Sequence, residues 1–368
     1  MADALSRPPS YRKLAWLRLK ENRAAVSGLV VLAVLGLACL FGPWLTGHAY
    51  DRVYPDYVRE PASLGAHPGP DRITPAVERI AQRMRVRLSA LSVDGERFRA
   101  TLVGTRPIDE RNLALFDRSD LFGSVTILAR SDENRTLEVE GQLERRRFVL
   151  GTDSNGRDLL TRMLIAGRIS LAIGILASLV ALVIGVGYGA ASGYAGGRTD
   201  MVMMRIVDIL YALPFIFFVI LLVTFFGRNF LLMFLAVGAI EWLDMARIVR
   251  GQTLTLKRQE FVQAAEAMGV GTADILRRHI IPNLLGPVVV FVTLLVPKVI
   301  LLESFLSFLS LDVQEPMTSL GVLISEGAKS IQGAGYLLLF PAGMLILLLL
   351  ALNFIGDGLR DALDPRDR

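Results

Sequence analysis

The 368-residue sequence contains a single cysteine, Cys39, so no disulfide bond can form within the chain. It contains no Gly-Lys dipeptide, which excludes a P-loop of the usual kind and an ATPase that depends on one. Its three histidines, His48, His67 and His279, are too scattered for a recognisable zinc site, and neither His-Glu-x-x-His nor Gly-x-Ser-x-Gly occurs. The chain therefore offers no familiar catalytic centre.

Charged residues are also sparse, at 20% of the chain against 52% for hydrophobic residues, and the mean hydropathy is +0.47. These values exclude a disordered chain and argue against an ordinary soluble enzyme. The net charge of +5 does not require nucleic acid, because membrane proteins concentrate Lys and Arg on their cytoplasmic side. We therefore expect an all-α integral membrane protein.

Long stretches without charged residues recur, and about 20 apolar residues cross a bilayer as a helix. The fourth such stretch crosses only if Glu241 to Ala246 continue its helix. The first, 24–45, is long for a signal peptide and no Ala-x-Ala site follows it, so we interpret it as an uncleaved anchor. Basic residues in the tail 1–23 and before the fifth span place both termini in the cytoplasm. The six predicted spans are 24–45, 169–197, 209–227, 229–246, 280–305 and 330–356.

Residues 46–150, between the first two predicted spans, differ in composition from the apolar flanks. This segment is nearly neutral, and prolines interrupt its first third. We predict strands at Ala100–Val103 and Ser124–Ala129 and a helix at Ala76–Leu91. The segment is expected to form a small α+β or irregular extracytoplasmic domain; the alternative is a poorly ordered insertion.

Residues 251–282 form a cytoplasmic segment whose pattern predicts a helix, a turn and a second helix. The first helix covers Glu260–Met268, and Gly269 ends it as a residue free to adopt a left-handed cap. Thr272 is the expected N-cap of a second helix that runs to about His279, and Pro282 closes the segment. Such a surface fits a groove on another protein, whereas the alternative is an amphipathic linker on the membrane surface. Helical spacing places four residues on one face of the first helix: Phe261, Ala264, Ala265 and Met268.

Several motifs resemble a known family. Gln263-Ala264-Ala265-x-x-x-Gly269, followed by Ile280-Ile281-Pro282, resembles the EAA motif of ATP-binding-cassette (ABC) importer permeases, with Gln263 where that motif usually has Glu. Gly151–Asp158 is similar to the GTDxxGRD signature of the oligopeptide/dipeptide permease family. The chain thus resembles C-type permease subunits of that family. Further similar stretches are Trp242–Gly251, Glu303–Leu309, Gln314–Pro316 and Asn353–Pro365.

The resemblance implies the type I ABC importer (MetI-like) fold, with a permease core at 151–356, a cytoplasmic tail at 357–368 and an extracytoplasmic insertion between helices one and two. It implies a bacterial inner-membrane location and no catalysis or cofactor in this chain, since ATP and Mg belong to partner ATPases. The implied partners are a B-type permease in a heterodimer, two cytoplasmic ATPases, an extracytoplasmic peptide-binding protein and membrane lipid, but no nucleic acid. The residues implied to dock the ATPase are Phe261, Gln263, Ala264, Ala265, Met268, Gly269, Asp274, Arg277, Arg278 and Pro282.

Charged residues inside predicted spans are functional candidates. Lys298 and Glu303 fall near the outer end of the fifth span, and we interpret them as lining the translocation path or contacting a second subunit; snorkelling of Lys298 is the alternative. Glu241 and Asp244 fall near the inner end of the fourth span, where we expect Asp244 to pair with Arg247 or Arg250.

The substrate implied by the resemblance is an oligopeptide, with dipeptides, modified peptides or nickel chelates as alternatives. A secondary transporter is the alternative from another class, but it needs a coupling-ion site and leaves the helix-turn-helix without a role. An intramembrane enzyme is a third class, and no pair of nucleophile and base occurs at membrane depth.

Overall fold

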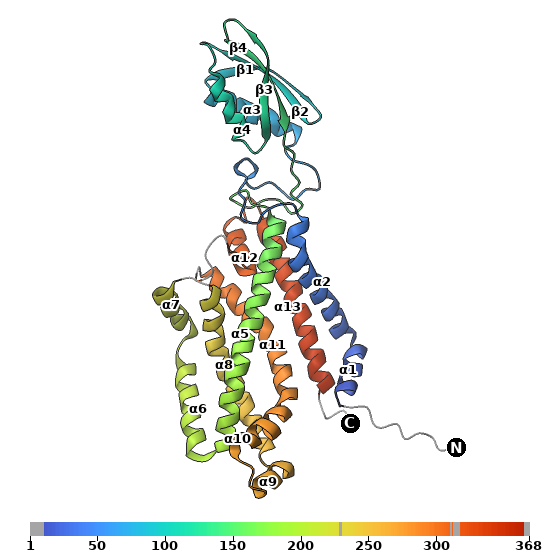
Figure 1. Ribbon diagram of the computed structural model, residues 1–368, viewed down its shortest axis with the longest axis vertical. Coiled ribbons are helices and arrows are strands. Elements are labelled where there is room, and N and C mark those ends of the chain that lie inside the picture. Colours follow the sequence, from blue (N-terminus) through green and yellow to red (C-terminus); the bar gives the residue numbers. More distant parts are fainter. Residues whose placement is uncertain (1–10, 228–229, 310, 312–316, 364–368) are drawn as a thin grey trace, which may run out of the picture. The chain divides into compact units, whose positions relative to one another are not determined.

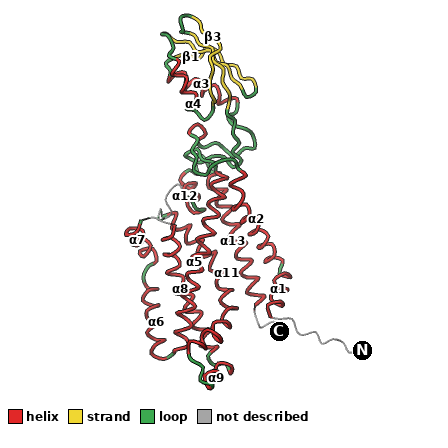
Figure 2. Tube along the Cα trace, in the orientation of Figure 1, coloured by secondary structure: helices red, strands yellow, loops and turns green. Residues whose placement is uncertain are grey.

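The computed structural model describes residues 11–227, 230–309, 311 and 317–363. They belong to two units, which we call the helical unit (Met1–Gly42, Met163–Lys329 and Leu338–Arg368) and the strand-containing unit (Pro43–Arg162 and Ser330–Leu337). Figure 2 shows helices in red and strands in yellow. Asn229, the motif Gln314–Pro316 and the outermost residues of both tails, 1–10 and 364–368, lie outside the described residues.

The helical unit is built from apolar helices that pack around buried aliphatic side chains. One end of it carries α1, α9, α10 and the last turns of α13 (Figure 1). Its helices are α1 (Tyr11–Glu21), α2 (Arg23–Leu45), α5 (Leu159–Ala195), α6 (Gly197–Ala212), α7 (Phe215–Phe226), α8 (Phe230–Leu256), α9 (Glu260–Ala267), α10 (Thr272–Ile275), α11 (Ile281–Phe308), α12 (Leu320–Lys329) and α13 (Tyr336–Leu363).

By length and composition, four described helical stretches can cross a membrane: α2, α5, the continuous run Thr272–Phe308 and α13. The pair α6 and α7 makes a fifth if it counts as one span, although it is bent by 79°. Helix α8 has 27 residues and continues through Glu241–Ala246, but it carries four charged residues within that length. The spans predicted at 24–45 and 280–305 correspond closely to α2 and α11.

The straight helix predicted at 209–227 is wrong, because the chain breaks between Ala212 and Phe215. Pro214 has no backbone N–H to donate, and its ring disfavours the helical conformation at the preceding residue. Leu213 accordingly adopts an extended conformation with ψ 129°. The buried helix α12 was not predicted.

Close contact between α5 and α8 depends on small residues in α5. A side chain added at Gly189 would place its Cβ 2.9 Å from the Cβ of Val249. The neighbouring Ala190 is buried against the same cluster as Val249. Small residues at such positions allow two helix backbones to approach in an apolar environment.

The strand-containing unit is an α+β domain around one hydrophobic core. Its four strands pair antiparallel in the order β1-β2-β4-β3, so β1 and β3 are the edge strands. Each edge strand follows a helix in the chain. Residues alternate between core and solvent along β2 and β4, as expected for a sheet with one covered face. Its elements are the short helices Pro55–Tyr57 and Glu110–Leu113, α3 (Pro70–Arg83), α4 (Ala114–Asp117), β1 (Val86–Asp94), β2 (Arg97–Gly104), β3 (Phe122–Ser131) and β4 (Thr136–Leu143).

The predicted strands at Ala100–Val103 and Ser124–Ala129 lie within β2 and β3. The helix predicted at Ala76–Leu91 is wrong beyond Arg83, because Arg85 adopts a left-handed conformation with φ 60° and the chain then enters β1. Pairing of β1 with β2, which follows it in the chain, stabilises this extended conformation.

Candidate functional site

The residues that resemble the EAA motif form a bent connection, α9 followed by α10, which we call the elbow (residues 260–282). Val262 and Ala265 lie one helical turn apart on the inner face of α9 and are buried against α5, α8 and α11. The Tyr194 hydroxyl donates to Glu266 Oε1 at 2.8 Å, and Lys257 donates to the Tyr194 carbonyl at 2.6 Å. The elbow is therefore held against the helical unit along one side.

The turn of the elbow ends α9 in a Schellman arrangement. Gly269 has φ 77°, its N–H donates to the Glu266 carbonyl, and the N–H of Val270 donates to the Ala265 carbonyl at 3.1 Å. Gly269 thus ends the helix as predicted. Gly271, rather than Thr272, is the N-cap residue of the next helix, and Thr272 is its first residue.

The second part of the elbow does not end at Pro282. Leu276–Ile280 form one turn of π-helix that continues into α11, and Pro282 is the second residue of α11. The elbow is consequently one continuous structure with a span-length helix.

The predicted docking residues fall on two sides of the elbow. Helical spacing does place Ala265 beside Phe261, Ala264 and Met268, but Ala265 lies at the edge of that face next to Val262 and is buried, so its prediction as an exposed docking residue is wrong. The side chain of Met268 is 76% exposed. The predicted docking residues that are exposed are Phe261, Gln263, Ala264, Met268, Gly269, Asp274, Arg277, Arg278 and Pro282.

A charged cluster lies between the middle of α8 and α11. Lys298 Nζ lies 2.7 Å from Glu241 Oε2 and 3.0 Å from Asp244 Oδ2. Lys298 and Glu241 lie ten and eleven residues from the ends of their helices, at Phe308 and Phe230, or about 15–17 Å at 1.5 Å per residue. Both charges therefore lie well inside their helices rather than at the helix ends.

The charged cluster borders a cavity of about 510 Å³. Its other walls come from α8, from α11 and from the break between α6 and α7, including Pro214 and Phe218. Glu241 is only 4% exposed, whereas the Lys298 side chain is 53% exposed. The cavity thus combines apolar walls with one accessible cation and its two carboxylates.

The pairing expected for Asp244 is wrong. Arg247 instead contacts Asp208 at 2.9 Å, and Arg250 contacts Asp200 at 2.5 Å. Both aspartates belong to α6, which packs beside α8, so the two arginines bridge α6 and α8. Asp244 pairs with Lys298 instead.

Glu303 lies inside the helix packing rather than on the wall of this cavity. It is fully buried, and Ser170 and Ser307 donate hydrogen bonds to its carboxylate at 3.2 and 2.9 Å. Ser170 also accepts from the N–H of Leu320 at the start of α12. Glu303 thus connects α5, α11 and α12, and the structure does not place it on a path or an outer surface.

The Gly151–Asp158 signature forms a tight turn in the strand-containing unit. Asp153 accepts hydrogen bonds from Arg157 Nε at 2.8 Å and Arg162 Nη1 at 2.5 Å, and all three side chains are buried. Such charge-assisted bonds are short and satisfy groups that would otherwise be buried without partners. The signature therefore has a structural role here.

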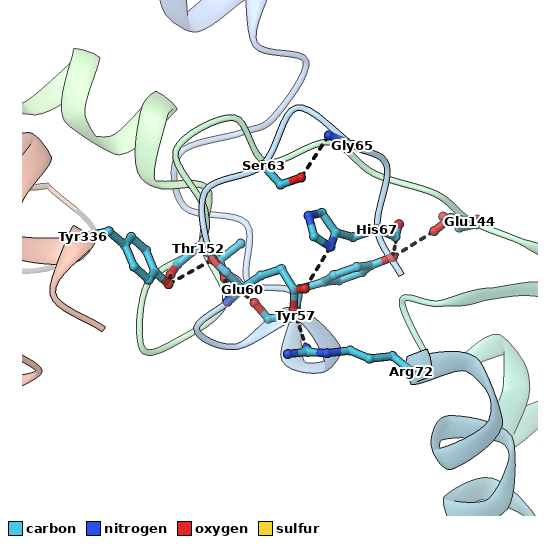
Figure 3. A network of polar contacts seen from close by, with 9 residues as sticks. All are labelled: Tyr57, Glu60, Ser63, Gly65, His67, Arg72, Glu144, Thr152 and Tyr336. Atoms are coloured by element: carbon cyan, nitrogen blue, oxygen red, sulfur yellow. Dashed lines mark hydrogen bonds and ion pairs between the residues drawn. The ribbon is translucent and has the colours of Figure 1, made fainter. Parts of the chain in front are cut away.

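A polar network joins this turn to distant segments of the same unit (Figure 3). The Thr152 hydroxyl donates to the Tyr57 carbonyl, and the Tyr336 hydroxyl lies 2.9 and 2.7 Å from the carbonyls of Glu60 and Thr152. The buried Glu60 carboxylate meets Arg72 and His67 Nδ1, the latter at 2.8 Å. Among the residues that the structure describes, no group of His, Cys, Asp and Glu is placed to hold a metal ion.

Sequence reasoning missed two features of these sites. Val262 anchors the elbow, and its apolar side chain next to the predicted face was the available signal. No local signal linked Lys298 to Glu241, since 57 residues separate them.

Comparison with known proteins finds two family models of transport components that match this chain. The family model described as "Binding-protein-dependent transport system inner membrane component" matches residues 181–368, and the model described as "N-terminal TM domain of oligopeptide transport permease C" matches residues 10–62. Both the charged cluster and the elbow lie within the first match.

Individual relatives carry related names. The oligopeptide transport system permease protein OppC of Escherichia coli (strain K12) is 63% identical over 218 residues, which cover 59% of this chain and 72% of that protein. The dipeptide transport system permease protein DppC of Bacillus subtilis (strain 168) is 34% identical over 369 residues, covering 100% of this chain and 90% of that protein. A solved structure of the inward-facing MetNI methionine ABC transporter is 18% identical, with a TM-score of 0.46 and coverage of 55% of this chain and 96% of that chain.

Proposed function

This chain belongs to the family of binding-protein-dependent transport system inner membrane components, and from that membership we propose that it conducts oligopeptides across the bacterial inner membrane as a permease subunit of an ABC importer. The observation that carries the proposal is the 63% identity to an oligopeptide permease over 218 residues that include more than half of the chain. A permease subunit of this kind moves its substrate and leaves ATP hydrolysis to partner ATPases.

Transport by the reconstituted importer tests the substrate. Oligopeptides are expected to enter vesicles in an ATP-dependent manner, with dipeptides entering more slowly. The dipeptide permease DppC matches the whole chain, including the strand-containing unit, so dipeptides are the second candidate. Faster uptake of dipeptides would favour that candidate, whereas uptake that needs an ion gradient and no ATP would overturn the proposal of an ABC importer.

The elbow is proposed to dock on a partner ATPase. Its support is geometric: one face is anchored by Val262 and Ala265, and the adjoining exposed face presents Phe261, Ala264 and Met268. The small Ala264 lets a partner backbone approach between the two larger side chains. A surface that is rigidly joined to α11 can transmit movement of the ATPase to a membrane-crossing helix.

The proposed cycle follows from this connection. ATP binding closes the two ATPases, the elbows of both permeases move together, and the helices open the cavity outward; hydrolysis restores the inward-open state. The cycle requires that the elbow contacts the two ATPase states with different free energies. We propose a heterodimer with a B-type permease and an extracytoplasmic binding protein that delivers the peptide.

The docking proposal predicts the behaviour of one substitution. Met268→Asp places a charge on the exposed apolar side of α9 and should prevent the ATPase from co-purifying with the tagged chain, while the folded protein stays at the membrane. Leu64→Asp is the matched control, because Leu64 is 82% exposed but belongs to the strand-containing unit. Equal recovery of the ATPase with Met268→Asp and with the parent chain would contradict docking through this side.

Lys298, Glu241 and Asp244 are proposed to line the translocation path. A cavity of about 510 Å³ falls within the usual range for small-ligand sites of about 300–1,000 Å³. Its apolar walls suit peptide side chains, and its charges suit the ammonium and carboxylate ends of a peptide. Glu303 is left out of this proposal because it is fully buried.

Both termini are proposed to lie in the cytoplasm. The support is that α1, the elbow and the end of α13 occupy the same end of the helical unit (Figure 1). The sequence of α1 and of the elbow is also rich in Lys and Arg, as expected on the cytoplasmic side.

A further inference from the structure

An apolar groove of about 660 Å³ lies beside the elbow in the helical unit. Three helices form its walls: α1, the first turns of α11 and the last turns of α13. Trp16 and Leu19 come from α1, and Leu359 and Leu363 come from α13. The groove is separate from the cavity at Lys298, with which it shares no lining residue.

The walls are continuous stripes rather than isolated side chains. Pro282, Leu285 and Val289 follow the i, i+3, i+7 spacing of one helix face, and both Leu285 and Val289 are substantially exposed. The α1 wall is fixed in place because Leu19 packs with Ala25 and Ala362 in a small buried cluster. The groove thus has walls from three helices, of which α1 is held by packing against α2 and α13.

Two basic residues are close in the chain to residues that line this groove. Lys20 Nζ lies 5.2 Å from the ring centroid of Trp16, which is itself 53% exposed. Arg278 is exposed and precedes the lining residue Pro282 by about one helical turn. Its contact with Asp274, at 3.4 Å between two exposed side chains, is weak and leaves it accessible.

We propose that this groove binds one anionic phospholipid, with an acyl chain along the apolar walls and the phosphate between Lys20 and Arg278. The apolar stripes suit a hydrocarbon chain, and a tryptophan beside a lysine is the combination found at the boundary between hydrocarbon and headgroups. The α1 wall is followed directly in the chain by α2, which begins at Arg23 and is long and apolar enough to cross a membrane. Because Pro282 belongs to the elbow, the bound lipid would hold the elbow and α1 in a fixed relation.

Tryptophan fluorescence tests the site directly, since the chain has three tryptophans and one of them lines the groove. The full chain carrying Trp44→Phe and Trp242→Phe retains only Trp16, and the chain carrying Trp16→Phe and Trp242→Phe retains only Trp44. Both are reconstituted without partner subunits into phosphatidylcholine vesicles that contain increasing fractions of brominated phosphatidylglycerol or brominated phosphatidylcholine. Trp44 is 77% exposed in the last turn of α2 and reports ordinary bilayer contact.

The proposal predicts that brominated phosphatidylglycerol quenches Trp16 at a lower lipid fraction than brominated phosphatidylcholine, and that Trp44 shows no such preference. Lys20→Gln and Arg278→Gln should each lower the preference about fivefold, the effect expected for one basic residue near an anionic lipid surface. Equal quenching of Trp16 by both lipids would overturn the proposal. So would a preference that survives the double substitution, or a Trp16 that neither lipid quenches because protein covers it. Since no ATPase or peptide is present, these outcomes are independent of the proposed transport function.

Discussion

Replacing Gly269 by serine should weaken coupling between ATP hydrolysis and transport through the backbone alone. Gly269 has φ 77°, and an added Cβ there would meet no atom within 4 Å. The cost is therefore conformational: an L-residue in the left-handed region costs about 1–2 kcal/mol relative to the right-handed one. If this cost raises the free energy of the conformation in which the elbow docks, relative to other conformations of the turn, the population of the docking conformation drops about fivefold to thirtyfold.

A second glycine in the same turn supplies the control. Gly271 also has no atom within 4 Å of an added Cβ, but its φ is −65° and it is the N-cap residue of α10. Serine is a favoured N-cap residue, so Gly271→Ser should leave the elbow unchanged or slightly more stable. Asparagine tolerates the left-handed conformation better than other residues, so Gly269→Asn should recover part of the loss.

The assay is the ratio of peptide transported to ATP hydrolysed by the reconstituted importer, with the amount of assembled complex measured separately. We expect this ratio to fall for Gly269→Ser, to recover partly for Gly269→Asn and to stay at the parent value for Gly271→Ser. A normal ratio for Gly269→Ser, or an equal loss for both serine variants, would refute the reasoning from backbone conformation.

Two further predictions concern charged groups. Lys298→Met leaves Glu241 and Asp244 without their cation and should destabilise the helical unit by about 2 kcal/mol. Removing one partner of a fully buried ion pair costs about 3–5 kcal/mol, and the cost here is smaller because the Lys298 side chain is half exposed. Adding Glu241→Gln and Asp244→Asn should restore stability in denaturant titrations but not transport, and a triple variant that transports normally would exclude a role in the path. Burial, reinforced by the Asp56 carboxylate, raises the pKa of Asp120 in the strand-containing unit. The folded state then binds this proton more tightly than the unfolded chain does. The stabilisation that protonated Asp120 gives the folded state is therefore fully present below the ordinary pKa, and it is lost as the pH rises through the raised pKa. Asp120→Asn should therefore slow proteolysis of that unit in the full chain at neutral pH and not in acid; a benefit of equal size at both would contradict the shift.

Much of the helical unit could be predicted because its signals are local. A run of apolar residues must satisfy its backbone hydrogen bonds within itself in a membrane, so the sequence around α2 and α11 is sufficient to predict helices there. Gly269 could be predicted in the same way, since few residues other than glycine end a helix in the left-handed conformation without strain. The family motifs then led to the proposal that the elbow docks a partner ATPase.

The remaining features depend on neighbours that are distant in the chain. Periodicity placed Ala265 on a helix face, but only the packing of α5, α8 and α11 decides which face is covered. A charge in an apolar layer requires a partner, and the sequence offered Asp244 two nearby arginines and a distant lysine. In the structure both arginines pair with aspartates of α6, so Asp244 pairs with Lys298. Composition and local pattern thus determine where helices form and end, whereas the pairing of charges and the choice of buried faces follow from which helices the fold brings together, because desolvated groups are satisfied by whatever lies beside them.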